Sequence, residues 1–313
     1  MMLIITVLCI LLVGFIYQLI WVKYERTNYP PIGQMIEVEG HKMHIYSEGQ
    51  GSPTVVMTVG LGSPSAIVDF YRVLKGLSQY NRAVVYERPG YGWSEIANTP
   101  RTVEQITNEL YLLLEKSGEK PPYILVGHSM GSLEVLHFAQ KHPCLVSSVV
   151  LVDGGSPEFY NTFKFSTVGK IAIHAIRLVT RFGIIRILGN IATILGINTM
   201  KYFSKDMRNR AKATFYSNWF NDNSLQELKL VNQNATIVES YGPIGDIPLV
   251  IMSSEKSIEK VKGWKKTQES LLKWSGNSRM ELIQHASHGM HFNNPEVIVE
   301  EIIQVVNGNN PIE

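Results

Sequence analysis

The sequence predicts an α/β fold, with a mostly parallel sheet covered by helices on both faces. Short apolar runs typical of buried strands alternate with helical patterns through residues 34–155 and again after residue 241. One run, residues 123–126, leads directly into G-H-S-M-G at 127–131 and then into a helical pattern at 132–139. Because ligands of parallel sheets bind at the carboxyl ends of the strands, we expect the functional site at that edge.

The composition is that of an ordinary globular protein with one large core. Of the 313 residues, 45% are hydrophobic and 18% are charged, and the net charge of +2 gives no reason to propose a nucleic-acid partner. The two cysteines, Cys9 and Cys144, lie far apart, the first inside an apolar run, and imply no disulfide framework. The sequence has no Cys/His cluster with zinc spacing, no Walker loop and no dinucleotide fingerprint, so it predicts neither a metal nor a cofactor.

The first element is an apolar segment, residues 1–22, without a charged side chain. At about 1.5 Å per residue, a helix of this length crosses a hydrocarbon layer of about 30 Å. The segment lacks the basic start of a signal peptide, and bulky Trp21 and Tyr24 crowd its end, so we expect an uncleaved membrane anchor. Lys23 and Arg26 flank the anchor on its C-terminal side, and by the positive-inside tendency they place the domain that follows in the cytoplasm.

The next segments are a linker at 23–33, which contains two adjacent prolines, and the first part of the core at 34–155. Glycine-rich stretches at 60–64 and 87–94 each follow a predicted strand, and their glycines let backbone amides approach a ligand. We predict strands at 35–39, 42–47, 54–59, 83–86, 123–126 and 147–152, the first two forming a hairpin, and helices at 65–80, 102–116 and 132–139.

The alternation stops at residues 156–240, which show several helical stretches and no convincing strand. We interpret this segment as a helical cap over the site. The second part of the core, 241–313, follows, with strands at 247–252 and 280–283 and helices near 264–274 and 295–306.

The cap carries eleven Lys and Arg against five Asp and Glu. Lys170, His174, Arg177 and Arg181 recur at helical spacing and form one basic stripe. Such a stripe is either a solvated helix face or a surface for anionic lipid headgroups near the anchor.

Ser129, at the centre of G-H-S-M-G, is the candidate nucleophile. Small residues at both glycine positions allow a strained strand-to-helix turn that exposes the serine hydroxyl. A serine hydroxyl needs a neighbouring base, itself held by a carboxylate. His288 is the preferred base because it lies in the loop between the last strand and the last helix, and His285 and His291 are the alternatives.

Several of these patterns resemble the α/β-hydrolase family over residues 34–306. The resemblance rests on the nucleophile elbow, the oxyanion loop, a D-x-R-G-x-G-x-S loop with Glu87 in place of the aspartate, and the histidine loop, at residues 127–131, 59–62, 86–94 and 288–296 respectively. It implies an eight-stranded sheet with a cap, and it implies that the amides of Leu61 and Met130 form the oxyanion hole.

The position of the acid in the chain differs from the common pattern of that family. The family usually places a carboxylate after the strand at 247–252, but the stretch here is S-E-K-S at 254–257, with serine in the place of the acid. Some members carry the acid after the strand that follows the elbow helix, where this chain has Asp153. We therefore expect Asp153 to complete the triad in the order nucleophile, acid, histidine, with Glu255 or Glu259, or a purely structural Asp153, as alternatives.

The resemblance implies a serine hydrolase that cleaves an ester or related acyl bond of a small, apolar substrate. Six cap aromatics are candidates to line its pocket or to form the core of the cap: Phe163, Phe165, Phe182, Phe203, Phe215 and Trp219. Serine at the elbow argues against epoxide hydrolase or haloalkane dehalogenase chemistry, which uses aspartate there. Acyl transfer, peptidase and carbon–carbon bond hydrolase activities use the same parts, and a ligand-binding or signalling module and a membrane-tethered structural protein are the non-enzymatic alternatives. The sequence indicates no oligomeric state.

Overall fold

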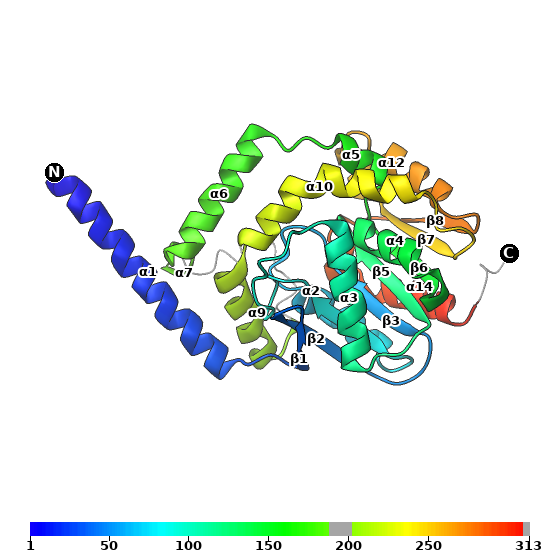
Figure 1. Ribbon diagram of the computed structural model, residues 1–313, viewed down its shortest axis with the longest axis horizontal. Helices are drawn as coiled ribbons and strands as arrows, with labels where there is room; N and C mark the ends of the chain where they lie inside the picture. The colour runs from blue at the N-terminus through cyan, green and yellow to red at the C-terminus, as the bar shows by residue number, and fades with distance from the viewer. Residues whose placement is uncertain (188–201, 309–313) are drawn as a thin grey trace.

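The computed structural model describes residues 1–187 and 202–308 (Figure 1). Residues 188–201 of the predicted cap and residues 309–313 of the second core part therefore lie outside the described residues. The eight strands are β1 (Gln34–Val38), β2 (His41–Glu48), β3 (Thr54–Thr58), β4 (Ala83–Glu87), β5 (Tyr123–His128), β6 (Val146–Val152), β7 (Leu249–Ser254) and β8 (Ser278–Ile283).

All eight strands belong to one sheet, in the order β1-β2-β4-β3-β5-β6-β7-β8. β2 pairs antiparallel with both β1 and β4, and the other neighbours pair in parallel. The predicted fold class, a mostly parallel eight-stranded sheet, is confirmed.

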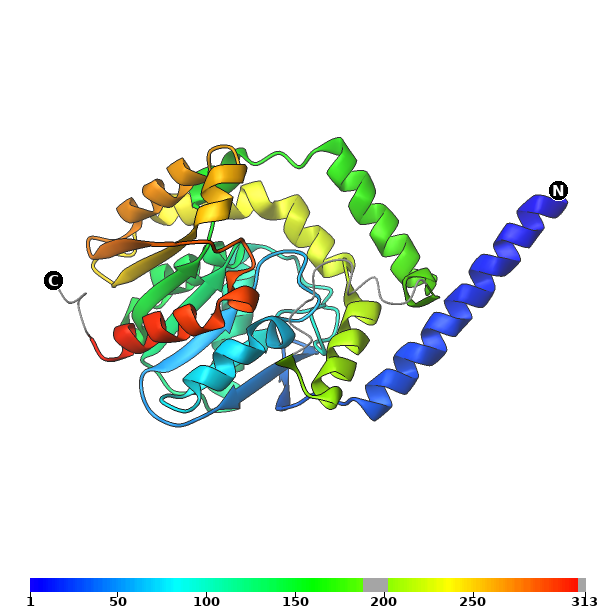
Figure 2. The same cartoon turned by 180° about the vertical axis from the view of Figure 1, so that it is seen from behind.

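Helices cover both faces of this sheet and bury two separate cores. α2 (Ala66–Leu77) and α14 (Pro295–Val306) lie side by side on one face (Figure 2), and α3 (Val103–Ser117) and α4 (Gly131–Lys141) cover the other. Along β3, Val55 and Met57 point into the first core while Val56 points into the second, because successive side chains of a strand alternate between its faces.

Near the C-terminal edge of the sheet, α12 (Trp264–Leu271) corresponds to the helix expected near 264–274. Two short helices, α11 (Glu255–Lys260) and α13 (Met290–Asn293), were not predicted. Each has fewer residues than a full amphipathic pattern needs, so hydrophobic periodicity gives no signal for it.

The cap is helical in its described residues, 156–187 and 202–240, and contains no strand there, as expected. Its helices are α5 (Pro157–Thr162), α6 (Thr167–Arg181), α7 (Ile184–Ile187), α9 (Lys205–Asn218) and α10 (Asp222–Tyr241). α10 runs from the cap onto α3 and α4, so this helix joins the cap to the body of the fold (Figure 1).

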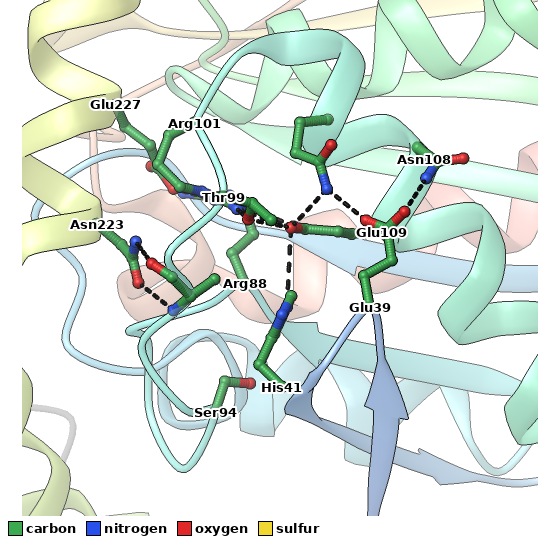
Figure 3. Close-up of polar contacts among 12 residues, drawn as sticks. Glu39, His41, Arg88, Ser94, Thr99, Arg101, Asn108, Glu109, Asn223 and Glu227 are labelled. Carbon is green, nitrogen blue, oxygen red and sulfur yellow. Dashed lines mark hydrogen bonds and ion pairs between the residues drawn. The ribbon is translucent and has the colours of Figure 1, made fainter.

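A buried polar network fixes the segment that follows β4 against the cap (Figure 3). Arg88 donates from Nε and Nη2 to the carboxylate of Glu227 on α10, at 3.1 Å each, and from Nη1 to the carbonyl oxygen of Val59 at 2.7 Å. Arg101 forms a two-pronged pair with Glu109 on α3, at 2.8 and 2.6 Å. The cap and the loop after β3 are therefore positioned by the same arginine, Arg88.

The N-terminal helix α1 (Met2–Asn28) is 27 residues long, with a mean hydropathy of 2.7 in its most apolar window. Within the described residues it is the one helix long and apolar enough to cross a membrane. The predicted linker at 23–33 is wrong over its first six residues, because the helix continues to Asn28, just before the adjacent Pro30 and Pro31, which oppose a helix.

Candidate active site

Ser129 lies in the sharp turn between β5 and α4 with a backbone φ of +53°, in the left-handed region. The two flanking glycines leave no room for a side chain. A Cβ at Gly127 would lie 2.7 Å from Val135 Cγ2, and one at Gly131 would lie 2.9 Å from the carbonyl oxygen of Val59. The strained turn expected from G-H-S-M-G is therefore present, and the glycines make it possible.

His288 connects Ser129 to Asp153. Its Nε2 lies 3.0 Å from Ser129 Oγ, and its Nδ1 lies 2.8 Å from Asp153 Oδ2. When Nδ1–H donates to the carboxylate, Nε2 is free to accept the serine proton, which is the arrangement a general base needs. The structure thus brings together three side chains that the sequence places at the ends of β5 and β6 and after β8.

The carboxylate of Asp153 is buried and receives hydrogen bonds from several elements. Besides His288, the Ser254 amide (3.0 Å), the Ser257 hydroxyl (2.7 Å) and Trp264 Nε1 (2.9 Å) donate to it. Burial by itself raises the pKa of Asp153, but the hydrogen bonds from His288, Ser257 and Ser254 outweigh burial and lower the pKa to about 2. The stretch 254–257, in which a serine stands where the family usually has its acid, therefore donates hydrogen bonds to Asp153.

The alternative residues lie elsewhere. Glu255 accepts a hydrogen bond from the backbone amide of His285 at 2.7 Å, and Glu259 is exposed. The His285 side chain is 92% exposed, whereas His291 is buried against Phe70. In the described part of the chain, His288 is the histidine within hydrogen-bond distance of Ser129.

The predicted oxyanion-hole donors are the amides of Leu61 and Met130, which follow Gly60 and Ser129 in the chain. Met130 is the N-terminal cap residue of α4, where helix geometry leaves backbone N–H groups without an intrahelical acceptor. A Cβ at Gly60 would lie 3.0 Å from both the Met130 nitrogen and Ser129 Oγ, so Leu61 follows a glycine packed directly on the elbow. Neither amide donates a hydrogen bond to another residue that the structure describes.

A cavity of about 280 Å³ lies in front of His288 and Leu61, between the loop after β3, α2 and α9. Its wall is mainly apolar. Of the six cap aromatics considered above, Phe215 and Trp219 line this cavity. The other four pack elsewhere: Phe182 against Phe15, Phe203 against Tyr71, and Phe163 and Phe165 against each other.

Sequence reasoning missed Tyr160 and His128 as neighbours of the triad. The buried Tyr160 hydroxyl lies near the Ser129 side chain, and burial raises the pKa of this tyrosine. His128 Nε2 lies 2.9 Å from the carbonyl oxygen of His288, and burial lowers the pKa of His128, so its neutral ring supports the histidine loop. His128 precedes the serine in the elbow, which gave a positional signal, but Tyr160 reaches Ser129 through the docking of α5, which no local pattern encodes.

An acidic residue that the sequence analysis did not single out, Asp69, lines the cavity. Asp69 on α2 is buried, and burial raises its pKa to about 8, so the carboxyl group is mostly protonated at neutral pH. Among the described residues, no group of three or more His, Cys, Asp or Glu side chains is arranged to hold a metal ion.

Comparison with known proteins identifies the fold of this chain as the α/β-hydrolase fold. A family model described as alpha/beta hydrolase fold matches residues 53–168. The uncharacterized protein YbdG of Bacillus subtilis (strain 168) is 28% identical over 240 residues, 77% of this chain and 74% of that relative. Potato (Solanum tuberosum) epoxide hydrolase I has a TM-score of 0.69 at 16% identity, over 88% of this chain and 99% of its own. The enol-lactonase of Burkholderia xenovorans LB400 has a TM-score of 0.64 at 16% identity, over 88% of this chain and 100% of its own. At these identities the two solved structures show a shared fold.

Proposed function

We propose that this chain, which has the α/β-hydrolase fold, is a serine hydrolase that cleaves an ester or related acyl bond of a small apolar substrate. The observation that supports this most strongly is the continuous hydrogen-bonded path from Ser129 Oγ through His288 to Asp153. The apolar cavity beside His288 and Leu61 suits an acyl chain.

In the proposed reaction, His288 Nε2 takes the proton of Ser129 while the serine oxygen attacks the substrate carbonyl. Asp153 stays ionised and stabilises the imidazolium that forms. The amides of Leu61 and Met130 donate to the oxyanion, and loss of one such donor costs about 3 kcal/mol in the barrier. His288 then protonates the leaving alcohol, and a water molecule activated by His288 hydrolyses the acyl-enzyme and regenerates Ser129.

An acyl substrate is favoured over an epoxide, although epoxide hydrolases share the fold. The nucleophile at the elbow is serine, and an acyl-serine ester is readily hydrolysed with the oxyanion held by two amides. The enol-lactonase, whose name indicates an acyl substrate, has the same fold at similar identity. We further propose that α1 is a membrane anchor, on the basis of its length and apolar composition.

A fluorophosphonate probe, which labels activated serines, tests the nucleophile. We expect the full-length protein to be labelled and Ser129→Ala to lose the label and the hydrolysis of a short p-nitrophenyl ester. A wild-type protein that is folded but unlabelled would instead favour a ligand-binding module.

Two carboxamide variants test the acid. Asp153→Asn should lower ester hydrolysis by about 10⁴-fold, because the histidine is then held in the wrong tautomer. Glu255→Gln is the matched control, and we expect it to retain activity. The assignment of Asp153 fails if Glu255→Gln is the variant that loses activity.

A further inference from the structure

Helix α1 docks onto the cap through two buried polar side chains. Gln18 and Glu25 are 6% and 8% exposed, although most of the helix is exposed. Arg186 on α7 donates to both carboxylate oxygens of Glu25, at 2.5 and 2.6 Å, and to Gln18 Oε1 at 2.5 Å. A charged group on an apolar helix is costly unless it is paired, so this contact specifies how α1 lies against the cap.

Close packing accompanies the polar contact. A Cβ at Gly14 would lie 2.5 Å from the carbonyl oxygen of Phe182, at the end of α6, so the helix backbone directly contacts the cap there. The rings of Phe15 and Phe182 pack edge to face at 6.4 Å. α1 therefore packs against the cap in addition to being a candidate anchor (Figure 1).

The same helix is connected to the active-site cavity through α9. Gln18 Nε2 donates to the carbonyl oxygen of Tyr216 at 2.7 Å, and the neighbouring Phe215 lines the cavity. Trp219, directly after α9, lies in the wall of that cavity and also in the wall of a groove of about 250 Å³ beside Leu19 and Val22 of α1. One indole side chain thus borders both spaces.

The exposed surface of α6, whose C-terminal end borders this groove, is apolar and basic. On α6, Val168, Ile171 and Leu178 are 77%, 64% and 55% exposed, and Lys170 and Arg181 are exposed on the same helix. A helix with this composition is typical of the headgroup and acyl boundary of a bilayer. Because the end of α6 contacts Gly14 and Phe15, a bilayer that holds the part of α1 before Gly14 also lies next to α6.

We propose that α1, α6 and α9 form a membrane-facing entrance through which a membrane-resident acyl lipid reaches Ser129 past Trp219. This inference rests on the proposed function, which supplies the reaction. It adds the substrate class, an ester with a long acyl chain held in the bilayer. The Arg186–Glu25 pair keeps this entrance aligned with the membrane.

A charge exchange tests the coupling between α1 and the cavity. The full-length protein is placed in vesicles of phosphatidylcholine and anionic phosphatidylglycerol, and two 4-methylumbelliferyl esters are compared: the palmitate in the bilayer and the acetate in water. Arg186→Glu should lower the palmitate-to-acetate rate ratio by about tenfold, since it leaves buried Glu25 facing a like charge. Adding Glu25→Arg should restore the ratio, and Lys266→Glu, a charge reversal at an exposed position of α12 outside the cap and α1, should leave it unchanged.

The outcomes distinguish failure of the proposed membrane entrance from failure of the proposed function. Equal loss of both activities in Arg186→Glu, or an unchanged ratio, overturns the entrance. Absence of both activities and of fluorophosphonate labelling in the wild type overturns the proposed function.

A second measurement on the same vesicles does not depend on turnover. In a Cys9→Ser, Cys144→Ser background, an environment-sensitive fluorophore is attached after Leu178→Cys on α6 or, as the control, after Tyr80→Cys, an exposed position outside the cap and α1. We expect quenching by brominated lipids at position 178 and none at position 80. Equal quenching at both positions, or none at position 178, overturns the docking of α6 on the bilayer.

Discussion

Asp153 shows how a residue that does not contact the proposed nucleophile can orient the proposed base, His288. Its carboxylate accepts hydrogen bonds from β7, α11, α12 and the histidine loop, and these bonds keep it ionised although it is buried. A buried ionised acid of this kind orients the imidazole only while its other donors are in place.

Ser257→Ala removes one of these donors. We expect the kcat/KM for a p-nitrophenyl ester at pH 7 to fall about tenfold, because a hydrogen bond to a charged group contributes about 1.5 kcal/mol. Ser253→Ala is the matched control, since the Ser253 hydroxyl is also buried in this region but donates to Gln268. Equal losses in the two variants would show that Ser257 acts only through general packing.

Asp69 provides a test of pH dependence. Its pKa is about 8 in the folded protein against an ordinary 3.8, so between these values the folded state binds more protons than the unfolded state. The free energy of unfolding should therefore fall as the pH rises from about 4 to about 8, by about 5 kcal/mol. Asp69→Asn should flatten this dependence in chemical unfolding of the full chain in detergent, whereas Asp206→Asn, at an exposed carboxylate, should not. An unchanged slope in Asp69→Asn contradicts the raised pKa.

At the scale of elements, the end of β4 shows a long acid accommodated by a glycine. Glu87 accepts hydrogen bonds from His44 Nδ1 at 2.8 Å and from the Trp93 amide at 2.7 Å. A Cβ at Gly92 would lie 1.8 Å from the Glu87 carboxylate oxygens, and Gly92 has a φ of +50°. The substitution of glutamate for the aspartate of the family pattern therefore depends on this glycine.

Gly92→Ala should lower the free energy of unfolding by about 2 to 4 kcal/mol, because it combines a positive φ with a clash. Combining it with Glu87→Asp should recover part of that loss, since the shorter side chain retracts from position 92. The coupling is measured by chemical unfolding of the wild type, both single variants and the double variant. Strictly additive effects would show that the clash with Glu87 is not the cause.

The sequence predicted the positions of the longer strands and helices best. The apolar run at 123–126 and the helix predicted at 295–306 correspond to β5 and α14, because each has a periodicity that its own residues create. The boundary of α1 was wrong, and α11 and α13 were missed, because helix ends and single turns depend on caps and on packing more than on periodicity.

At the scale of the whole molecule, the chain combines a domain of the α/β-hydrolase fold with an apolar helix packed against its cap. Lys23 and Arg26 follow the apolar run, on the side of the catalytic domain. By the positive-inside tendency we expect that domain in the cytoplasm.

The exposed Cys144 allows this orientation to be measured. In a Cys9→Ser background, a membrane-impermeant maleimide should leave Cys144 unlabelled in intact cells and label it after the cells are permeabilised. Labelling in intact cells would place the catalytic domain outside and reverse the predicted orientation.

The sequence by itself determined the strand and helix order, the elbow around Ser129 and the position of His288 in a loop after the last strand. These features are encoded by neighbouring residues, whose spacing fixes local conformation. Only the tertiary structure decided which carboxylate lies beside His288, which two cap aromatics face the cavity, and that Gln18 and Glu25 dock α1 on the cap. Each of these depends on contacts between segments far apart in the chain, which form when the cap and sheet pack together and which no local pattern records.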